Sequence, residues 1–153
     1  MEGYNGRLDA IQAGILLAKV KRLPDWNERR REKAGQYRSL LASADLDLVP
    51  PFEPEWSKAV YHLYVVRAPE RDQLRSWLSE ARIGTGIHYP VPLHLQKAYR
   101  SLGYGAGDFP LAERATREVL SLPMYPELTI AQQRRVVEEL LEARPAAGVS
   151  RRA

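Results

Sequence analysis

The sequence predicts an α+β domain in which helices cover a small, mostly antiparallel sheet. Segments with helical spacing of apolar residues are interleaved with a few short stretches rich in β-branched and aromatic residues. The length of 153 residues is that of one ordinary domain, and a content of 44% hydrophobic and 27% charged residues is typical of a folded globular protein.

The first predicted helix, from about residue 9 to residue 22, is apolar on nearly every face. Only Gln12, Gly14 and Lys19 interrupt the apolar residues between Ala10 and Val20. A helix that covers one side of a core shows an apolar stripe instead. We therefore expect this helix to be buried on two sides, against the rest of the chain and against a further domain or a second subunit.

A break at Leu23-Pro24-Asp25 separates this helix from an amphipathic helix over about residues 25–41, because the residue before a proline avoids the α conformation. A short strand is predicted at Leu48-Val49, before two prolines. The clearest strand is Ala59 to Ala68, and His62 inside it is expected to be a hydrogen-bonded core histidine. The stripe of the amphipathic helix consists of Trp26, Ala34, Tyr37 and Leu41.

Pro69 suits the first turn of another helix. A short strand over Ile83 to Tyr89 then leads into a loop that carries His88, Tyr89 and His94 next to two prolines. Prolines stiffen the backbone, so this loop is predicted to hold its side chains in place. The helix after Pro69 is expected to bury Leu74, Trp77, Leu78 and Ala81.

The rest of the chain alternates between helical and irregular segments. One or two helical turns are predicted at Leu95 to Leu102, a helix at Asp108 to Leu120, and a short strand at Ser121 to Met124. Thr129 and Gln132 form a capping-box pattern at the start of a final helix. The buried faces of these two helices are predicted to consist of Leu111, Ala115 and Val119, and of Val136, Val137, Leu140 and Leu141.

The composition narrows the class of protein. Cysteine is absent, which excludes a disulfide framework and fits a reducing compartment. No apolar run approaches the roughly 18 residues of a membrane span, and the first ten residues do not resemble a signal peptide, so we expect a cytoplasmic protein. The net charge of +4 permits an anionic ligand, but the basic run over residues 28–33 is diluted by glutamates and has no interleaved aromatics, so nucleic acid is not expected.

Five segments together resemble one family. Gly3 to Ala13, GYNGRLDAIQA, looks like the G-x-N-x-R-[LM]-[DE]-x-[IL]-Q-A signature of the DegT/DnrJ/EryC1/StrS sugar aminotransferases. Trp26 to Arg30 resembles the W-N-x-x-R-R of the following helix, and His62 to Val66 resembles a central strand of that family. Gly86 to His94 resembles the HY-x-P-x-H loop, and Leu122 to Met124 matches a late L-P-[ML]. The segments follow the family order over about residues 3–142.

The resemblance implies the C-terminal small domain of a pyridoxal-phosphate enzyme of the aspartate-aminotransferase fold type, over residues 1–143 with the interdomain helix at about 9–22. Residues 144–153 are expected to be a disordered tail. In the family, a large N-terminal domain supplies the Schiff-base lysine. None of this chain's lysines lies in the sequence setting of that Schiff-base lysine, so no catalytic residue is assigned to this chain. The large domain is expected to be absent, and the chain is therefore expected to be inactive alone. Pyridoxal 5′-phosphate is therefore expected only in the full-length enzyme, with no covalent link to this chain.

The resemblance also assigns binding residues. Asn5 matches an asparagine that reaches the cofactor phosphate bound in the neighbouring subunit, although Asn5 also suits a turn. Arg7 could add a charge-assisted bond to that phosphate or to an acidic partner, or could pair with Asp9. His88 and Tyr89 match residues that line the nucleotide-sugar pocket. His94 either joins them or holds the loop by a backbone hydrogen bond. A metal site formed by His88 and His94 lacks a carboxylate or cysteine at ligand spacing, so no metal is expected.

The sequence therefore favours the C-terminal portion of an aminotransferase that moves an amino group, from glutamate as the expected donor, to a keto sugar linked to a nucleotide. Its expected partners are the N-terminal domain or a second copy, through residues 9–22. Two alternatives stay open at this point. One is a part of a sugar dehydratase that uses the same cofactor. The other is a free-standing, non-catalytic module for dimerisation or binding. In that case the apolar first helix would leave a large apolar surface exposed to water.

Overall fold

The computed structural model describes residue 6 and residues 8–143. Asn5, Arg7 and the predicted tail over residues 144–153 lie outside the described residues. Helices and a small antiparallel sheet make up the described part, which confirms the predicted α+β class. The elements are α1 (Ala10–Val20), α2 (Leu23–Ser43), β1 (Tyr64–Arg67), α3 (Arg71–Glu80), the short 3-10 helices η1 (Leu93–Leu95) and η2 (Lys97–Leu102), α4 (Pro110–Glu118), β2 (Val119–Leu122) and α5 (Ile130–Glu142).

The first two helices differ slightly from their predicted bounds. Asp9 caps α1 by accepting a hydrogen bond from the backbone N–H of Gln12 at 2.8 Å. The predicted break between the two helices is present, but it lies at Lys21 and Arg22 and not at Leu23 to Asp25, because α2 already begins at Leu23. Pro24 lies in the first turn of α2, where the N–H that proline lacks would have no helical partner.

The sheet consists of β1 and β2 in antiparallel register, with Tyr64 opposite Leu122 and Arg67 opposite Val119. The predicted strand over residues 59–68 is therefore too long. Tyr61 has a φ of +49°, which removes the chain from the extended conformation just before β1. The predicted strands at residues 48–49 and 83–89 are each reduced to a single bridging pair, Val49 with Arg67 and Gly86 with Ser121.

The core lies between α2, α3, α5 and the two strands. The side chain of Gln133 on α5 is buried and donates a hydrogen bond to the backbone carbonyl of Lys33 on α2 at 2.8 Å, which fixes these helices side by side. The largest fully buried apolar side chains are Tyr37, Tyr64, Leu78, Leu120, Leu128, Leu140 and Val66.

Several predicted burials are wrong. Helix α4 ends at Glu118, so Val119 and Leu120 belong to β2, and Leu111 points to solvent because α4 covers the sheet mainly at its C-terminal end. Trp77 is partly exposed, and its indole N–H donates to Glu139 at 3.2 Å. Leu141 is also partly exposed, at the outer side of α5.

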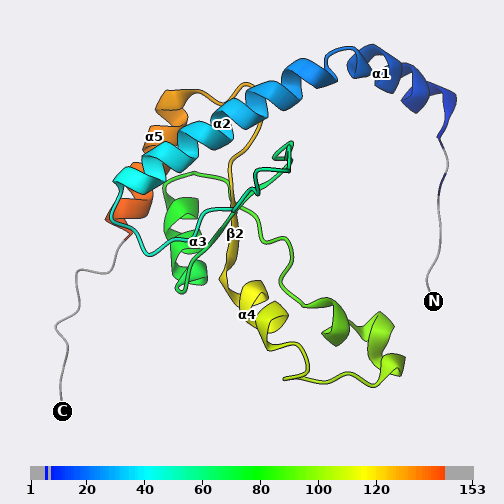
Figure 1. Cartoon of the computed structure of the whole chain (residues 1–153), viewed down its shortest axis with the longest axis vertical. Coiled ribbons are helices and arrows are strands. Elements are labelled where there is room, and N and C mark those ends of the chain that lie inside the picture. The colour runs from blue at the N-terminus through cyan, green and yellow to red at the C-terminus, as the bar shows by residue number, and fades with distance from the viewer. Residues whose placement is uncertain (1–5, 7, 144–153) are drawn as a thin grey trace.

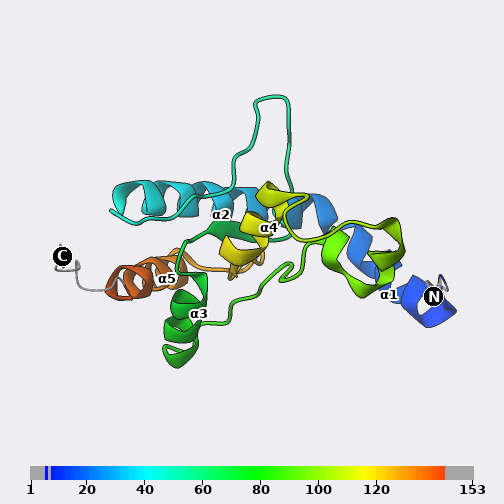
Figure 2. The same cartoon turned by 90° about the horizontal axis from the view of Figure 1, so that it is seen from below.

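Helix α1 and the segment that carries η1 and η2 both extend from the same side of the body, as Figures 1 and 2 show. Figure 1 shows them well apart, with α1 continuing beyond α2 and the η1–η2 segment at the opposite end. No residue of α1 is buried, so the predicted burial of this helix against the rest of the chain is wrong for the described residues. None of the described helices is long and apolar enough to cross a membrane.

The segment between α2 and β1 rises away from the body (Figure 2) and is fastened by Glu53. The Glu53 carboxylate accepts hydrogen bonds from Tyr61 Oη at 2.6 Å, from Arg31 Nη1 at 2.9 Å and from the backbone N–H of Ala59 at 2.6 Å. These bonds, the one from Tyr61 first, lower the pKa of Glu53 from 4.5 to about 2.

The lowered pKa of Glu53 predicts a pH-dependent contribution to stability. A carboxylate with a depressed folded-state pKa stabilises the fold above its unfolded pKa, and that contribution is lost as the pH falls through the folded pKa. We expect the melting temperature of the wild type to exceed that of Glu53→Gln by a constant amount above pH 4.5, and the difference to shrink between pH 4.5 and about 2. Thermal melts from pH 2 to pH 6 measure this, and an equal difference at both ends of the range would contradict it.

Candidate functional site

His88 is held at the edge of the sheet by β2. The backbone of Gly86 pairs with that of Ser121, with N–H to carbonyl distances of 3.1 and 2.8 Å. The pairing brings the His88 ring over the buried Ser121 side chain, and His88 Nδ1 lies 2.9 Å from Ser121 Oγ. His88 Nε2 has no hydrogen bond to any described residue. One ring nitrogen is therefore anchored while the other can meet a ligand.

Gly86 makes this position of the ring possible. A Cβ atom added to Gly86 would lie 2.6 Å from His88 Cε1 and 3.2 Å from Nδ1. Any side chain at this position would therefore displace the imidazole.

Tyr89 lies beside His88 and stays accessible. The two rings meet edge to face with centroids 5.5 Å apart, and Tyr89 is 70% exposed. Its hydroxyl has no hydrogen bond to a described residue. A free imidazole nitrogen and a free phenol next to each other can bind sugar hydroxyls or phosphate oxygens.

His94 is placed differently from His88. Its side chain is buried, and Nε2 lies 3.1 Å from Glu113 Oε1 on α4. The same carboxylate oxygen accepts the backbone N–H of Gly107 at 2.8 Å. The bond from Gly107 and then the one with His94 lower the pKa of Glu113. His94 thus holds the loop through a carboxylate, and not through the backbone hydrogen bond that the sequence suggested as one alternative.

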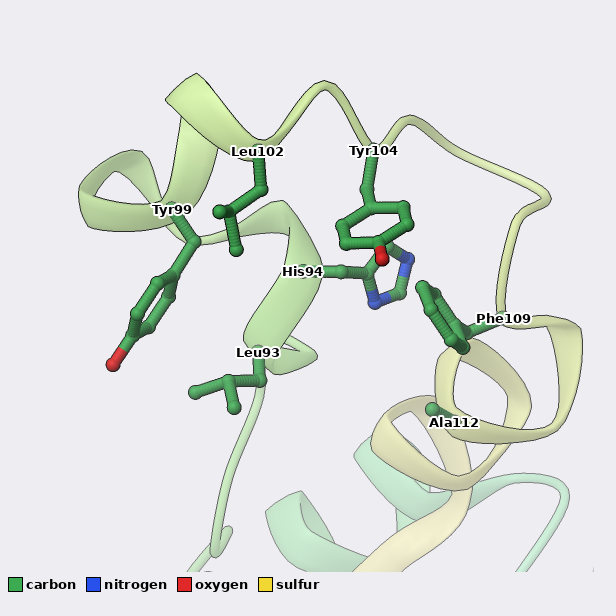
Figure 3. A pocket seen from close by; sticks show the side chains of 7 residues that line it. All are labelled: Leu93, His94, Tyr99, Leu102, Tyr104, Phe109 and Ala112. Carbon is green, nitrogen blue, oxygen red and sulfur yellow. The ribbon is translucent and has the colours of Figure 1, made fainter.

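His94 also belongs to a pocket of about 350 Å³ between the η1–η2 segment and α4 (Figure 3). The His94 ring contacts that of Phe109 with centroids 4.8 Å apart, and Phe109 meets Tyr104 edge to face at 5.1 Å. The lining residues are Leu93, His94, Tyr99, Leu102, Tyr104, Phe109 and Ala112. We call this the aromatic pocket. Its walls are almost entirely apolar, so it suits a flat or apolar group.

The predicted site residues therefore fall into separate groups. His88 and Tyr89 are brought together on the β2 side, whereas His94 is fastened to α4 by Glu113. Within the described residues, no cluster of three or more His, Cys, Asp or Glu side chains could hold a metal ion. Asn5 and Arg7 lie outside the described part.

His62 is not a core residue, which corrects the sequence interpretation. It is exposed and lines a pocket of about 570 Å³ together with Trp26, Asn27 and Arg30. The Arg30 guanidinium donates from Nη1 to the carbonyls of Tyr61, His62 and Met124 at 3.0–3.2 Å. Because these bonds fix the turn at Tyr61, His62 points away from the sheet.

Sequence reasoning missed three residues that build the site: Ser121, Glu113 and Phe109. Ser121 stands in an apolar strand directly before the Leu122-Pro123-Met124 motif, and a polar residue at a buried strand position was the available signal. Glu113 and Phe109 gave no comparable local signal, because α4 alone does not reveal that they meet His94.

No lysine of this chain is placed for a covalent link to pyridoxal phosphate in the pockets described above. Lys33 on α2 pairs with Glu32 at 3.4 Å, and the exposed Lys58 lies 3.8 Å from Glu28. None of the chain's lysines, which also include Lys19, Lys21 and Lys97, lines the aromatic pocket or the pocket at His62. The described residues therefore do not fit the Schiff-base role, and any covalent cofactor site requires a lysine from elsewhere.

The sequence of this chain is similar to those of known aminotransferases. The model of the DegT/DnrJ/EryC1/StrS aminotransferase family matches residues 1–141. A "pleiotropic regulatory protein" of Geobacillus stearothermophilus is 50% identical over 92% of this chain and 38% of its own length. A dTDP-3-amino-3,4,6-trideoxy-alpha-D-glucose transaminase of Streptomyces venezuelae is 41% identical over 92% of this chain and 37% of its own length.

A solved structure is similar as well. The crystal structure of S. venezuelae DesV in complex with a ketimine intermediate superimposes with a TM-score of 0.84 and 40% identity, over 95% of this chain and 39% of DesV. The chain thus spans little more than a third of the length of these relatives.

Proposed function

The chain belongs to the DegT/DnrJ/EryC1/StrS aminotransferase family, and we propose that it is the C-terminal portion of an aminotransferase that acts on a nucleotide-linked keto sugar. Enzymes of this family depend on pyridoxal phosphate. The observation that carries the proposal is the His88–Tyr89 pair, which is anchored by a buried strand and presents free polar atoms to a ligand.

In this proposal the whole enzyme moves an amino group from glutamate to the sugar ketone and releases 2-oxoglutarate. Pyridoxal phosphate, when bound by a lysine of a preceding domain, supplies the electron sink for this transfer. The residues of this chain bind and orient the substrate. His88 Nε2 and the Tyr89 hydroxyl bond oxygen atoms of the sugar nucleotide, and Ser121 keeps the imidazole in place. Asn5 and Arg7 are proposed to contact the cofactor phosphate in the neighbouring subunit.

The exposed apolar surface of α1 supports the proposed partner. Six apolar side chains on or beside this helix are more than half exposed: Leu8, Ile11, Ile15, Leu16, Leu17 and Val20. Such a patch marks an interaction surface. We propose that α1 packs against the large domain of the enzyme and a second subunit, which would remove this surface from water.

A chimeric enzyme tests the proposed function. The segment of the S. venezuelae transaminase that matches this chain is replaced by residues 1–141, and the purified chimera is supplied with glutamate and a dTDP-linked keto sugar. We expect formation of the amino sugar together with an equal amount of 2-oxoglutarate. The matched control carries the same segment with His88→Ala and Tyr89→Phe, and is expected to lose most of this activity.

The chimera contradicts the proposal if it is folded, assembled and loaded with cofactor, as judged by circular dichroism, light scattering and its absorbance, yet forms no amino sugar. Unchanged activity in the His88→Ala, Tyr89→Phe control would instead contradict the roles assigned to these two residues.

A further inference from the structure

We propose that the aromatic pocket binds the nucleobase and ribose of the nucleotide-linked sugar, an inference that rests on the proposed function. The pocket lies on the same segment as His88 and Tyr89 and begins four residues after Tyr89, at Leu93. Its volume of about 350 Å³ is at the lower end of the range of roughly 300–1,000 Å³ for small-molecule sites. The pocket is therefore large enough for part of a nucleotide, and it lies only a few residues along the chain from the residues proposed to hold the sugar.

The lining favours an uncharged aromatic ring. Figure 3 shows Tyr99, Leu102 and Leu93 on one side of the pocket and Tyr104 and Phe109 on the other. No Asp, Glu, Lys or Arg belongs to the lining, so the pocket itself does not attract a phosphate group. Every nucleobase has a flat aromatic face, so any base can stack on aromatic side chains. A pocket lined by aromatic rings can therefore bind a base without reading its polar edge.

The pocket is held in shape before a ligand arrives. Glu113 fastens His94 and the Gly107 backbone together, so the two ends of the loop that carries Tyr104 are fixed to α4. Only Nε2 of the buried His94 ring is hydrogen-bonded, and Nδ1 has no partner among the described residues. An unpaired nitrogen on a buried ring at the pocket wall can accept or donate a bond to the edge of a pyrimidine.

Two cations on the helix that supplies part of the lining suit the diphosphate. Lys97 and Arg100 lie on η2, the short helix that also supplies Tyr99 and Leu102 to the lining. Both are exposed, and neither side chain forms a hydrogen bond or ion pair with another described residue. An apolar aromatic pocket whose lining helix also carries two unpaired cations matches a nucleoside diphosphate, with the base inside the pocket and the phosphates outside it.

The test is a titration of the 153-residue chain, followed by methyl and aromatic NMR signals, with three probes: thymidine 5′-diphosphate, thymidine and ribose 5-phosphate. We expect thymidine 5′-diphosphate to shift the signals of Leu93, Leu102 and Phe109, thymidine to shift the same signals more weakly, and ribose 5-phosphate to leave them in place. Tyr104→Leu removes one ring and is expected to weaken thymidine binding at least about fivefold, because stacking contributes that much per base. Lys97→Gln with Arg100→Gln is expected to weaken the diphosphate and leave thymidine unaffected.

The matched control is Phe52→Leu, which removes a ring that is 89% exposed on the segment between α2 and β1. This variant is expected to bind thymidine 5′-diphosphate and thymidine like the wild type. The inference is overturned if thymidine shifts no pocket signal, if Tyr104→Leu binds as well as the wild type, or if the pocket signals change only with protein concentration, as they would for a socket that receives a second copy. An active chimera whose chain binds no nucleoside in this pocket overturns this inference alone and leaves the proposed function standing.

Discussion

Replacing Gly86 with alanine is expected to leave the fold intact and to reduce amination by the chimeric enzyme roughly 10- to 100-fold. The added Cβ would lie 2.6 Å from His88 Cε1, so the exposed imidazole must move away and lose its bond to Ser121 Oγ. A displaced imidazole would also lose its proposed hydrogen bond to an oxygen of the charged sugar nucleotide, and a bond to a charged group contributes about 1.5–3 kcal/mol. Stability should change little, because the displaced atoms belong to the far end of one side chain and alanine restricts the unfolded chain.

The comparison with Gly84→Ala makes this prediction specific. A Cβ at Gly84 meets no atom within 4 Å, so this variant shares the change in backbone entropy without the collision. Gly84→Ala should keep full activity. Ser121→Ala, which removes the bond while leaving Gly86 in place, should lower activity in the same direction as Gly86→Ala. The His88 ring signals in an NMR spectrum report the loss of the bond directly, and a Gly86→Ala enzyme with normal kcat/KM and unchanged His88 signals would disprove the role of Gly86.

The second large effect concerns α1. The double variant Ile11→Lys, Leu17→Lys is expected to abolish the self-association of the isolated chain and to prevent assembly of the chimeric enzyme. These side chains are 78% and 68% exposed, so they contribute little to the fold of the chain itself. Burial of an aliphatic side chain contributes about 1.5–3 kcal/mol, and the two substitutions together remove about 3–6 kcal/mol from the interface.

Sedimentation velocity over a range of concentrations measures the association. Leu111→Lys on α4 is the control, because it exchanges a side chain that is 80% exposed for the same charged residue away from α1. The control should associate like the wild type. A wild-type chain that sediments as a monomer at every concentration would contradict the proposed interface of α1.

The elements that the sequence predicted well share one property, which is that their signal is local. The all-round apolar α1, the stripe of α2 and the capping box of α5 each depend on residues within one or two turns of each other. The strand over residues 59–68 was overestimated because its β-branched and aromatic residues suit a strand, whereas the length of the ladder depends on the four-residue partner β2 and on Arg30, which fixes the turn at Tyr61.

Residue type and short-range spacing were enough to predict the α+β class, the family motifs, and the candidates His88, Tyr89 and His94. What each candidate does depends on contacts that form only when the chain folds. Ser121 lies 33 residues from His88 in the chain, and Glu113 lies 19 residues from His94, yet these contacts present one histidine to a ligand and bury the other. Such pairs form when the sheet and α4 pack together, and this packing depends on the whole core. The spacing of residues along one segment therefore cannot predict these contacts.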